Sequence, residues 1–303
     1  MKFDLILVRY AEIALKAKQT RKRFESTLVN NIKDALKSNN IQNNLRREWG
    51  RIYVYSDQIE KCLDVLKNIF GISSISPSIK TESTIKEISK IAISISKQEL
   101  DKNKSFAIRA TRTGYHEFSS QDVAVQIGND IVKHFKASVN LTNPDFELFV
   151  EIRNEKAYLF IEKIMGYGGM PVGTQGKILA LIDSPKAILA SWYLIHRGCK
   201  PIFLYTDEIK KDVIDKFLKY WFIKSKIFEI SKNEKINEQI NKIAAENKCD
   251  AIITGFTLFD DSKIVMKNIK QLKKKLELPI LHPLIAMEKK EINRKLKEIG
   301  LLK

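Results

Sequence analysis

The chain has 303 residues, of which 44% are hydrophobic, and it carries a formal net charge of +17. This length accommodates two or three domains, and the charge favours a polyanionic partner, either nucleic acid or an anionic membrane surface. A lysine-rich surface from a biased genome would also explain the charge. No apolar run approaches the roughly 18–20 residues that a membrane helix needs, so we predict a cytoplasmic protein that does not cross a membrane.

The first 75 residues predict a ferredoxin-like domain with the element order βαββαβ. Apolar residues at helical spacing indicate two helices, and short apolar runs indicate the strands. The expected elements are strand 3–9, helix 20–37 with Thr20 as a possible N-cap, strands 42–47 and 51–55, helix 57–69 and strand 72–79.

Residues 76–165 predict a second α/β module. It begins with an amphipathic helix at 84–99 and an alternating strand at 105–112. A polar loop then leads to a helix at 121–136, with Ser119 or Ser120 at its start. Strands 146–152 and 157–164 are expected to form a hairpin through Asn154-Glu155.

From residue 177 onward strands and helices alternate, which predicts a doubly wound parallel sheet. The expected strands are 177–182, 201–205, 226–230, 250–254 and 279–281, and the expected helices are 185–197, 208–222, 235–247, 261–275 and 288–299. The last strand is short and contains a proline, so we place it at or near an edge of the sheet.

The junction before this sheet carries the strongest local signal. Five of the twelve glycines lie between Gly166 and Gly176, directly before strand 177–182. A helix start follows, with Asp183 or Ser184 as N-cap and Pro185 at the first helical position. Glycine loop, strand and capped helix are the parts of a nucleotide-binding unit. However, no glycine lies between the strand and its helix.

Residues 8–32, 106–128 and 166–199, with weaker matches at 249–259 and 278–300, resemble the ThiI-type tRNA 4-thiouridine synthetases. The resemblance implies a mixed α/β chain with a ferredoxin-like N-terminal domain at 1–75, a THUMP domain at 76–165 and a PP-loop pyrophosphatase-like domain at 171–303. In that family the first two domains dock the acceptor end of a tRNA. The third adenylates a uridine with ATP, and sulfur then displaces AMP.

The residues that could contact tRNA form two groups. Basic side chains cluster where the first strand gives way to its helix, and arginines with interleaved aromatic rings flank the polar loop of the second module. These residues are Arg9, Lys16, Lys18, Arg21, Lys22, Arg23, Arg109, Arg112, Tyr115 and Phe118. The alternatives are a solvated helix face for the first group and ordinary loop packing for the aromatic residues.

The third module departs from the family pattern. The family's SGGxDSP phosphate loop has lost its Ser-Gly-Gly, because Ile182 runs directly into Asp183. The family's TGExLGQxxSQ is also altered, since Thr254-Gly255 is followed by Phe256. Phe256 and Phe259 are bulky enough to fill a nucleotide site, and the acidic pair Asp260-Asp261 would repel phosphate or merely complement a helix dipole.

The cysteines depart from the family pattern as well. Cys62, Cys199 and Cys249 are far apart, form no CxxC pair, and predict neither a disulfide framework nor a metal site. None of them matches a sulfur-carrying position of the family. Cys199 follows a helix C-terminus, where the dipole disfavours a thiolate.

Three functions therefore remain open. The first is a tRNA-binding protein with an eroded nucleotide site, working with a separate catalytic or sulfur-donor protein. The second is an active synthetase that uses ATP and Mg, with Asp183 as catalytic residue and Ala180, Leu181, Ser184 and Gly255, besides Gly173, around the nucleotide. The third is a non-catalytic scaffold. A homodimer is possible in each case.

Overall fold

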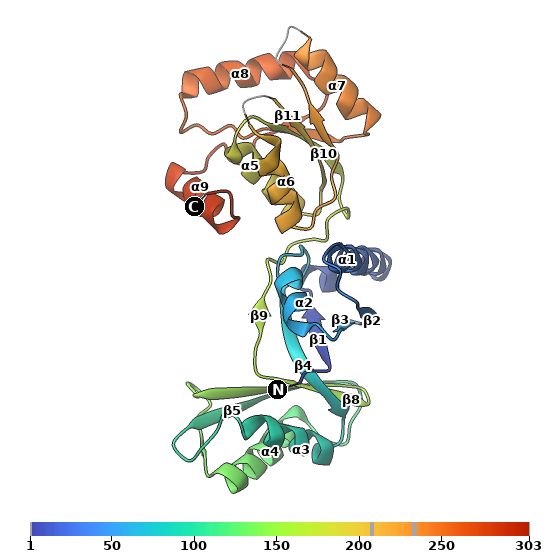
Figure 1. Cartoon of the computed structure of the whole chain (residues 1–303), viewed down its shortest axis with the longest axis vertical. Helices are drawn as coiled ribbons and strands as arrows, with labels where there is room; N and C mark the ends of the chain where they lie inside the picture. The colour runs from blue at the N-terminus through green and yellow to red at the C-terminus, as the bar shows by residue number, and fades with distance from the viewer. Residues whose placement is uncertain (1, 207–208, 232–234, 303) are drawn as a thin grey trace. The chain divides into compact units, whose positions relative to one another are not determined.

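The structure is a computed structural model that describes residues 2–206, 209–231 and 235–302 (Figure 1). It divides into two compact units. The first comprises the chain up to Arg9, Leu36–Lys67 and Ser74–Met165, and the second comprises Tyr10–Ala35, Asn68–Ser73 and the chain from Gly166 onward. None of the helices in the described ranges is both long and apolar enough to cross a membrane.

The first unit begins with the ferredoxin-like sheet. Its strands are β1 (Leu5–Arg9), β2 (Asn44–Glu48), β3 (Arg51–Tyr55) and β4 (Ser74–Glu82), in the order β2-β3-β1-β4. All neighbouring pairs are antiparallel. Helix α2 (Ile59–Leu66) packs against β1 and β4. This arrangement confirms the fold that the sequence predicts for its first 75 residues.

Strand β4 belongs to two sheets at once. Its first five residues pair with β1, and its last four, from Ile79 to Glu82, pair with β8 (Lys156–Phe160). The second sheet continues through β7 (Phe146–Arg153), β5 (Ser105–Thr113) and β6 (Ser138–Val139). The short β9 (Ile164–Met165) returns to pair with the start of β4.

Helices α3 (Ile85–Ser96) and α4 (Ser120–Phe135) cover one face of this second sheet. The predicted cap of α4 is Ser119, which forms a capping box with Asp122. Alternate residues of β7, among them Leu148 and Val150, face the helices, so the residues between them face the other way. The second α/β module is therefore built as expected.

Helix α1 (Lys18–Ser38) belongs to the second unit as far as Ala35. It begins two residues before Thr20, so the prediction that Thr20 caps it is wrong. A single turn of 3₁₀ helix, η1 (Glu12–Leu15), precedes α1, and the chain passes from one to the other through Lys16 and Ala17. The early start places Lys18 in the first turn of the helix.

The remainder of the second unit is a five-stranded parallel sheet. Its strands are β10 (Lys177–Ile182), β11 (Lys200–Tyr205), β12 (Ile227–Glu229), β13 (Ala251–Ile253) and β14 (Ile280–Leu281), in the order β12-β11-β10-β13-β14. All pairs are parallel. The last strand, β14, is an edge strand, as predicted, and Pro279 lies directly before it.

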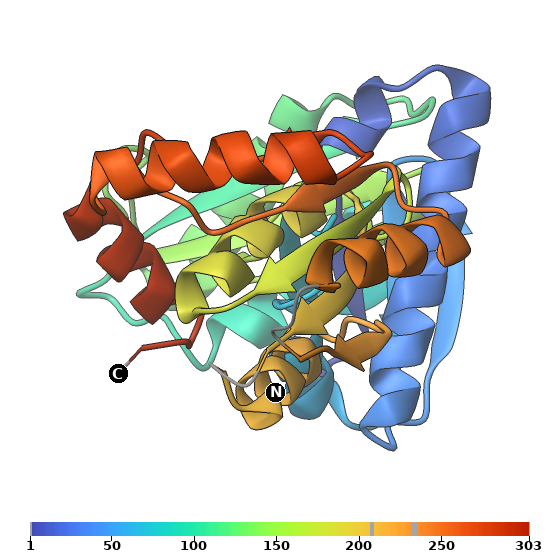
Figure 2. The ribbon, with the colours of Figure 1, turned by 90° about the horizontal axis from the view of Figure 1, so that it is seen from above.

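Helices cover both faces of this sheet because its strands are apolar on both sides. Ile178, Ala180 and Ile182 pack with α5 (Pro185–His196), α6 (Lys211–Tyr220) and α9 (Lys289–Glu298). Leu179 and Leu181 pack on the opposite side, with α7 (Ile236–Glu246) and α8 (Ser262–Lys275). Figure 2, seen from above, shows the orange α7 and α8 in one layer in front of the sheet. The doubly wound prediction is confirmed.

Candidate nucleic-acid interface and nucleotide-site frame

The start of α1 presents basic side chains to solvent. Lys18, Lys22 and Arg23 are exposed, whereas Lys16 and Arg21 are half-buried. Arg21 lies 4.0 Å from the carboxylate of Glu25, and the Arg23 guanidinium lies 5.2 Å from the ring centre of Phe24. The first turn of α1 also carries backbone N–H groups without helical partners, which together with these cations favour an anion.

The polar loop after β5 is held against the β7–β8 turn. His116 Nε2 donates to the carbonyl of Asn154 at 2.6 Å, and the ring of His116 lies 5.3 Å from that of Phe118. Arg112 donates to the carbonyl of Gly114 at 3.1 Å. This bracing leaves the side chain of Tyr115 93% exposed. A rigid loop with one projecting ring is suited to stacking on an unpaired base.

Arg109 lies on the same strand as Arg112 but has a different environment. Its guanidinium contacts the carboxylate of Glu147 at 2.7 Å and donates to the carbonyl of Leu141 at 2.7 Å. Both side chains of this ion pair are about one-third exposed. A phosphate can therefore reach Arg109, but it would share the guanidinium charge with Glu147. Arg109, Arg112, Tyr115 and Phe118 lie in the first unit, and the α1 cluster lies in the second.

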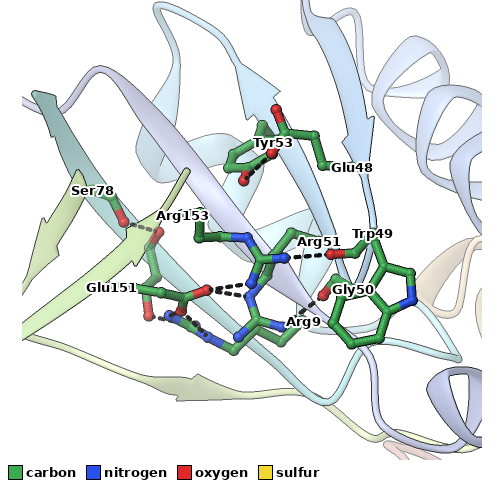
Figure 3. A network of polar contacts seen from close by, with 10 residues as sticks. Arg9, Glu48, Trp49, Gly50, Arg51, Tyr53, Ser78, Glu151 and Arg153 are labelled. Carbon is green, nitrogen blue, oxygen red and sulfur yellow. Dashed lines mark hydrogen bonds and ion pairs between the residues drawn. The ribbon is translucent and has the colours of Figure 1, made fainter. Parts of the chain in front are cut away.

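Arg9 belongs to a guanidinium cluster around one carboxylate (Figure 3). Glu151 Oε1 accepts from Arg51 at 2.6 Å, and its Oε2 accepts from Arg9 at 3.2 Å. Arg153 lies 3.4 Å from the same carboxylate and also donates to the carbonyl of Trp49. Arg9 reaches further to Ser76 at 3.0 Å. The cluster therefore ties β1, β3 and β4 to β7.

Three guanidiniums around one carboxylate give this cluster an excess positive charge. Burial alone would raise the pKa of Glu151, but Arg51, Arg9 and Arg153 together outweigh burial and hold that pKa below its usual range. The side chain of Arg9 is only 12% exposed. Arg9, proposed from the sequence as a tRNA contact, thus has its charge engaged within the sheet.

The junction after β10 is where the sequence predicts the frame of a nucleotide site. Pro185 occupies the first turn of α5 and Ser184 stands at the N-cap position, as predicted, but the Ser184 side chain makes no capping hydrogen bond. Ser184 Oγ donates a hydrogen bond to Asp183 Oδ1 at 2.9 Å, so the two side chains hold each other at the helix start. Because Ile182 passes directly to Asp183, the glycines that would let backbone amides wrap a phosphate are missing.

Gly255 covers this helix start. A Cβ at Gly255 would lie 2.6 Å from the Ala187 nitrogen and 2.8 Å from its Cα, so the loop after β13 rests directly on the first turn of α5. Beside it, Lys186 Nζ contacts the carboxylate of Asp260 at 2.6 Å. Backbone of the β13 loop and an acid therefore lie beside the helix N-terminus.

A mostly apolar cavity of about 190 Å³ remains at the carboxyl ends of the strands. Asp183, Thr206, Thr254 and Phe256 line it, with leucines and isoleucines from the strands and from α7 and α8. Thr254 Oγ1 lies 2.6 Å from His282 Nδ1, and Phe256 stacks on the His282 ring at 5.7 Å. Burial lowers the pKa of His282 and so favours the neutral imidazole.

The other proposed nucleotide residues do not meet at one place. Leu181 lines the carboxyl-end cavity with Asp183, whereas the side chain of Ala180 is fully buried in the core beneath α5. Gly173 lies at the opposite end of the sheet, where its N–H donates to the carbonyl of Gly198 at 2.9 Å, just beyond the C-terminus of α5. The structure therefore brings Asp183, Ser184 and Gly255 together around the start of α5 and leaves Gly173 apart.

The described residues offer neither a reactive thiol nor a metal centre. Cys62, Cys199 and Cys249 are free, and burial raises the pKa of each thiol. No group of three histidine, cysteine or acidic side chains within the described ranges has the geometry to hold a metal ion.

Sequence reasoning missed Glu151, Arg51, Arg153 and His282. Two acids, Glu147 and Glu151, lie among the outward-facing residues of β7, which was only a weak signal for Glu151. It could not be interpreted without knowing which arginines the fold brings to it, because Arg9 and Arg51 are separated from Glu151 by 142 and 100 residues.

Comparison with families of known proteins matches all three parts of the chain. The ThiI ferredoxin-like domain matches residues 5–76, the THUMP domain matches 82–162, and the thiamine biosynthesis protein (ThiI) model matches 223–303. A probable tRNA sulfurtransferase of Methanobrevibacter smithii is 32% identical over 99% of this chain and 87% of its own length. Its counterpart in Methanothermobacter thermautotrophicus is 33% identical over 98% of this chain and 85% of its own length.

Two solved structures share the whole fold. A crystal structure from Pyrococcus horikoshii superposes with a TM-score of 0.85 at 28% identity, covering 98% of this chain and all of its own. A crystal structure of a 4-thiouridine synthetase–RNA complex with bound ATP has a TM-score of 0.81 at 26% identity, covering 99% of this chain and 86% of its own.

Proposed function

Because this chain belongs to the ThiI-type tRNA sulfurtransferase family, we propose that it binds the acceptor end of a tRNA but does not adenylate it. The observation that carries this proposal is an intact three-module fold in which Ile182 leads directly into Asp183-Ser184-Pro185. The RNA-docking modules are present, whereas the loop that would hold ATP is missing.

The tRNA-binding half rests on two exposed groups and on one similar structure. Lys18, Lys22 and Arg23 offer cations at a helix start, and Tyr115 offers an exposed ring on a braced loop. Phosphates position an RNA, and aromatic rings hold its unpaired bases. A structure with the same fold is a 4-thiouridine synthetase–RNA complex, which supports RNA as the partner of this chain too.

The loss of adenylation rests on the start of α5. A triphosphate needs several backbone N–H donors on a permissive backbone, whereas here Ile182 leads directly into Asp183 and Lys186 beside the helix start is paired with Asp260. The remaining cavity of about 190 Å³ is smaller than the roughly 300 Å³ of an ordinary small-molecule site. An apolar cavity of this size suits a small uncharged group better than a nucleotide.

Sulfur transfer would also need a thiolate, and burial raises the pKa of all three cysteine thiols. Within a thiolation pathway this chain would therefore hold the tRNA while a separate protein supplies catalysis or sulfur. The rival proposal is an active synthetase with a remodelled site, in which Asp183, Ser184 and Gly255 contact ATP and Mg.

Calorimetry separates the two proposals. Titration of the full chain with Mg·ATP, with and without a tRNA transcript, should release no binding heat up to millimolar ATP. Micromolar binding that an Asp183→Ala variant abolishes would establish the remodelled site and overturn the loss of adenylation.

Filter binding tests the RNA half independently. The intact transcript should bind with a steep salt dependence, because phosphate contacts release counterions. The same transcript without its single-stranded 3′ end should bind more weakly. Equal affinity for both transcripts would contradict docking of the acceptor end, and weak binding insensitive to salt would favour the scaffold.

A further inference from the structure

The amino ends of the parallel strands surround a basic cleft that the proposed function does not use. Its volume is about 450 Å³. Five of its ten lining residues are lysines, against one carboxylate, that of Glu246. The lysines are Lys177, Lys200, Lys224, Lys226 and Lys248. This cleft lies at the end of the sheet opposite to Asp183 and Gly255.

The topology explains why these lysines converge. Lys177 and Lys200 are the first residues of β10 and β11, and Lys226 directly precedes β12. Parallel strands begin at the same edge of a sheet, so the three side chains start from neighbouring positions. The sequence shows no motif here, because the lysines are scattered over more than seventy residues and gather only when the sheet forms.

Two of the ammonium groups are held in place. Lys177 Nζ donates to the carbonyl of Asn247 at 3.2 Å, and Lys226 Nζ donates to the side-chain oxygen of Asn247 at 3.0 Å. Asn247 is itself buried and anchored, since its Nδ2 donates to the carbonyl of Ile243 at 2.8 Å. Fixed ammonium groups lose less side-chain entropy when an anion binds.

An aromatic pocket of about 170 Å³ adjoins the cleft and shares Lys200 and Lys224 with it. Phe70, Trp221 and Phe222 line this pocket. Trp221 is 1% exposed, and its indole N–H is buried without a hydrogen-bond partner among the described residues. Phe70 and Trp221 are each 1% exposed and stack on each other, so the half-buried Phe222 is the ring of these three that can meet a base beside the ammonium groups.

Helix α1 connects this region with the basic cluster at its own start. Asp34 of α1 contacts Lys224 at 2.8 Å, and Asn31 Nδ2 donates to the carbonyl of Val172 at 3.1 Å. At 1.5 Å per residue, the sixteen steps from Lys18 to Asp34 span roughly 24 Å. The exposed cations at the start of α1 and the lysine cleft therefore lie on one unit, at the two ends of one helix.

We propose that this lysine cleft binds the phosphodiester backbone of RNA and that the adjoining pocket accepts one unpaired base. The proposal rests on the proposed tRNA-binding function and extends it to the amino ends of the parallel sheet. Lysines there also offset the dipoles of α5, α6 and α7, which end at this edge. Dipole compensation alone does not account for an aromatic pocket that shares two of the lysines.

The test compares two double variants of the full chain with the same change in charge. Lys200→Glu/Lys226→Glu alters the cleft, and Lys289→Glu/Lys290→Glu alters exposed lysines in the first turn of α9, beyond the carboxyl end of β14. Affinity for a tRNA transcript is measured by filter binding over a series of salt concentrations. The cleft variant should bind at least about tenfold more weakly, with a salt slope smaller by about 2. The α9 variant should stay within about twofold of wild type.

The milder variant Lys200→Gln/Lys226→Gln guards against a folding defect, because it should keep the wild-type melting temperature and lose part of the affinity. Equal affinities for the cleft and α9 variants, with wild type binding tRNA, would overturn the cleft and leave the proposed function intact. Absence of tRNA binding by wild type would overturn both.

Lysine acetylation footprinting identifies the occupant. Bound tRNA should protect Lys200 and Lys226, whereas AMP or inorganic phosphate at the same phosphate concentration should not. Equal protection by AMP or by phosphate would mean a small-anion site and would overturn the RNA assignment.

Discussion

Gly255 rests on the first turn of α5 so closely that a Cβ there would lie 2.6 Å from the amide nitrogen of Ala187. The neighbouring atoms are backbone, which cannot move aside as the end of a flexible side chain would. The glycine is therefore required by close packing between the β13 loop and α5. This contact gives Gly255 a structural role that does not depend on a bound nucleotide.

Substitution of Gly255 by alanine should destabilise the second unit. The added methyl must push the β13 loop away from α5, and overpacking of this kind costs about 1–3 kcal/mol. Calorimetric unfolding should show a lower transition temperature. Gly128→Ala is the control, because a Cβ at Gly128 meets nothing within 4 Å. Gly128 lies in the middle of α4, where alanine in place of glycine should raise the free energy of unfolding by about 0.5–1 kcal/mol. A Gly255→Ala variant as stable as wild type would contradict the close contact.

Removal of the carboxylate of Glu151 should destabilise the first unit severely. Glu151→Gln leaves Arg9, Arg51 and Arg153 facing one another, and the loss of one partner of a buried ion cluster costs about 3–5 kcal/mol. Glu147→Gln is matched to it, because Glu147 lies on the same face of β7 and also pairs with an arginine, but is one-third exposed. We expect that control to lose less than about 1 kcal/mol in denaturant unfolding.

Protonation of Glu151 should make the protein less stable at acidic pH. The pKa of Glu151 in the folded state lies below its value in the unfolded chain, which is about 4.3. The contribution of Glu151 to the free energy of unfolding is therefore complete above that unfolded pKa and is lost as pH falls through the folded pKa. Unfolding measured between pH 7 and pH 3 should therefore show wild-type stability declining below about pH 4.5. The difference between wild type and Glu151→Gln should shrink over that range, and a constant difference would exclude this ion cluster as the cause.

The order of elements followed from the sequence because each strand and helix carries its own local pattern. Strand β10 has the predicted bounds, 177–182, since its apolar run is flanked by Gly176 and by the Asp183-Ser184-Pro185 helix start. Helix α1 starts earlier than predicted because its first turn, with Lys18 and Gln19, has no apolar periodicity. Local apolar patterns therefore predict the bounds of buried elements well and the ends of exposed helices poorly.

The sites were less predictable because they depend on distant residues. The sequence indicated the missing phosphate loop at Ile182–Pro185 and offered Tyr115 as a residue that could stack on a base, with ordinary loop packing as the alternative. It contained no signal that Arg9 would be buried against Glu151, because that pairing depends on β4 being shared by two sheets. The lysine cleft was likewise invisible, since its residues come from separate strands.

The exposed ring of Tyr115 predicts a stacking contact. Tyr115→Ala should weaken tRNA binding by about 1–3 kcal/mol, or roughly 5- to 150-fold, because it removes a surface on which a base can stack. Tyr115→Phe should bind as wild type does, since the ring remains. Neither change should alter the melting temperature, because the side chain is almost fully exposed. A Phe variant as weak as the Ala variant would instead assign the effect to the hydroxyl group.

Substitution of basic residues at the start of α1 should weaken tRNA binding, whereas substitution of Arg9 should lower stability, although the sequence placed all of them in one tRNA-binding group. Lys22→Glu/Arg23→Glu changes two exposed cations, so tRNA affinity should fall more than about tenfold and the salt slope by about 2, with melting unchanged. Arg9→Gln should chiefly lower the melting temperature, because Arg9 bonds Glu151 and Ser76 inside the sheet.

Binding isotherms over a salt series, paired with thermal melts of the same samples, separate these two outcomes. The Lys289→Glu/Lys290→Glu variant supplies the control for net charge, because both lysines are exposed and distant in sequence from α1. If Arg9→Gln reduced the salt slope without any change in melting, Arg9 would be a direct phosphate contact despite its ion pair. In that case the guanidinium cluster would have to open when RNA binds, with Arg51 and Arg153 retaining Glu151.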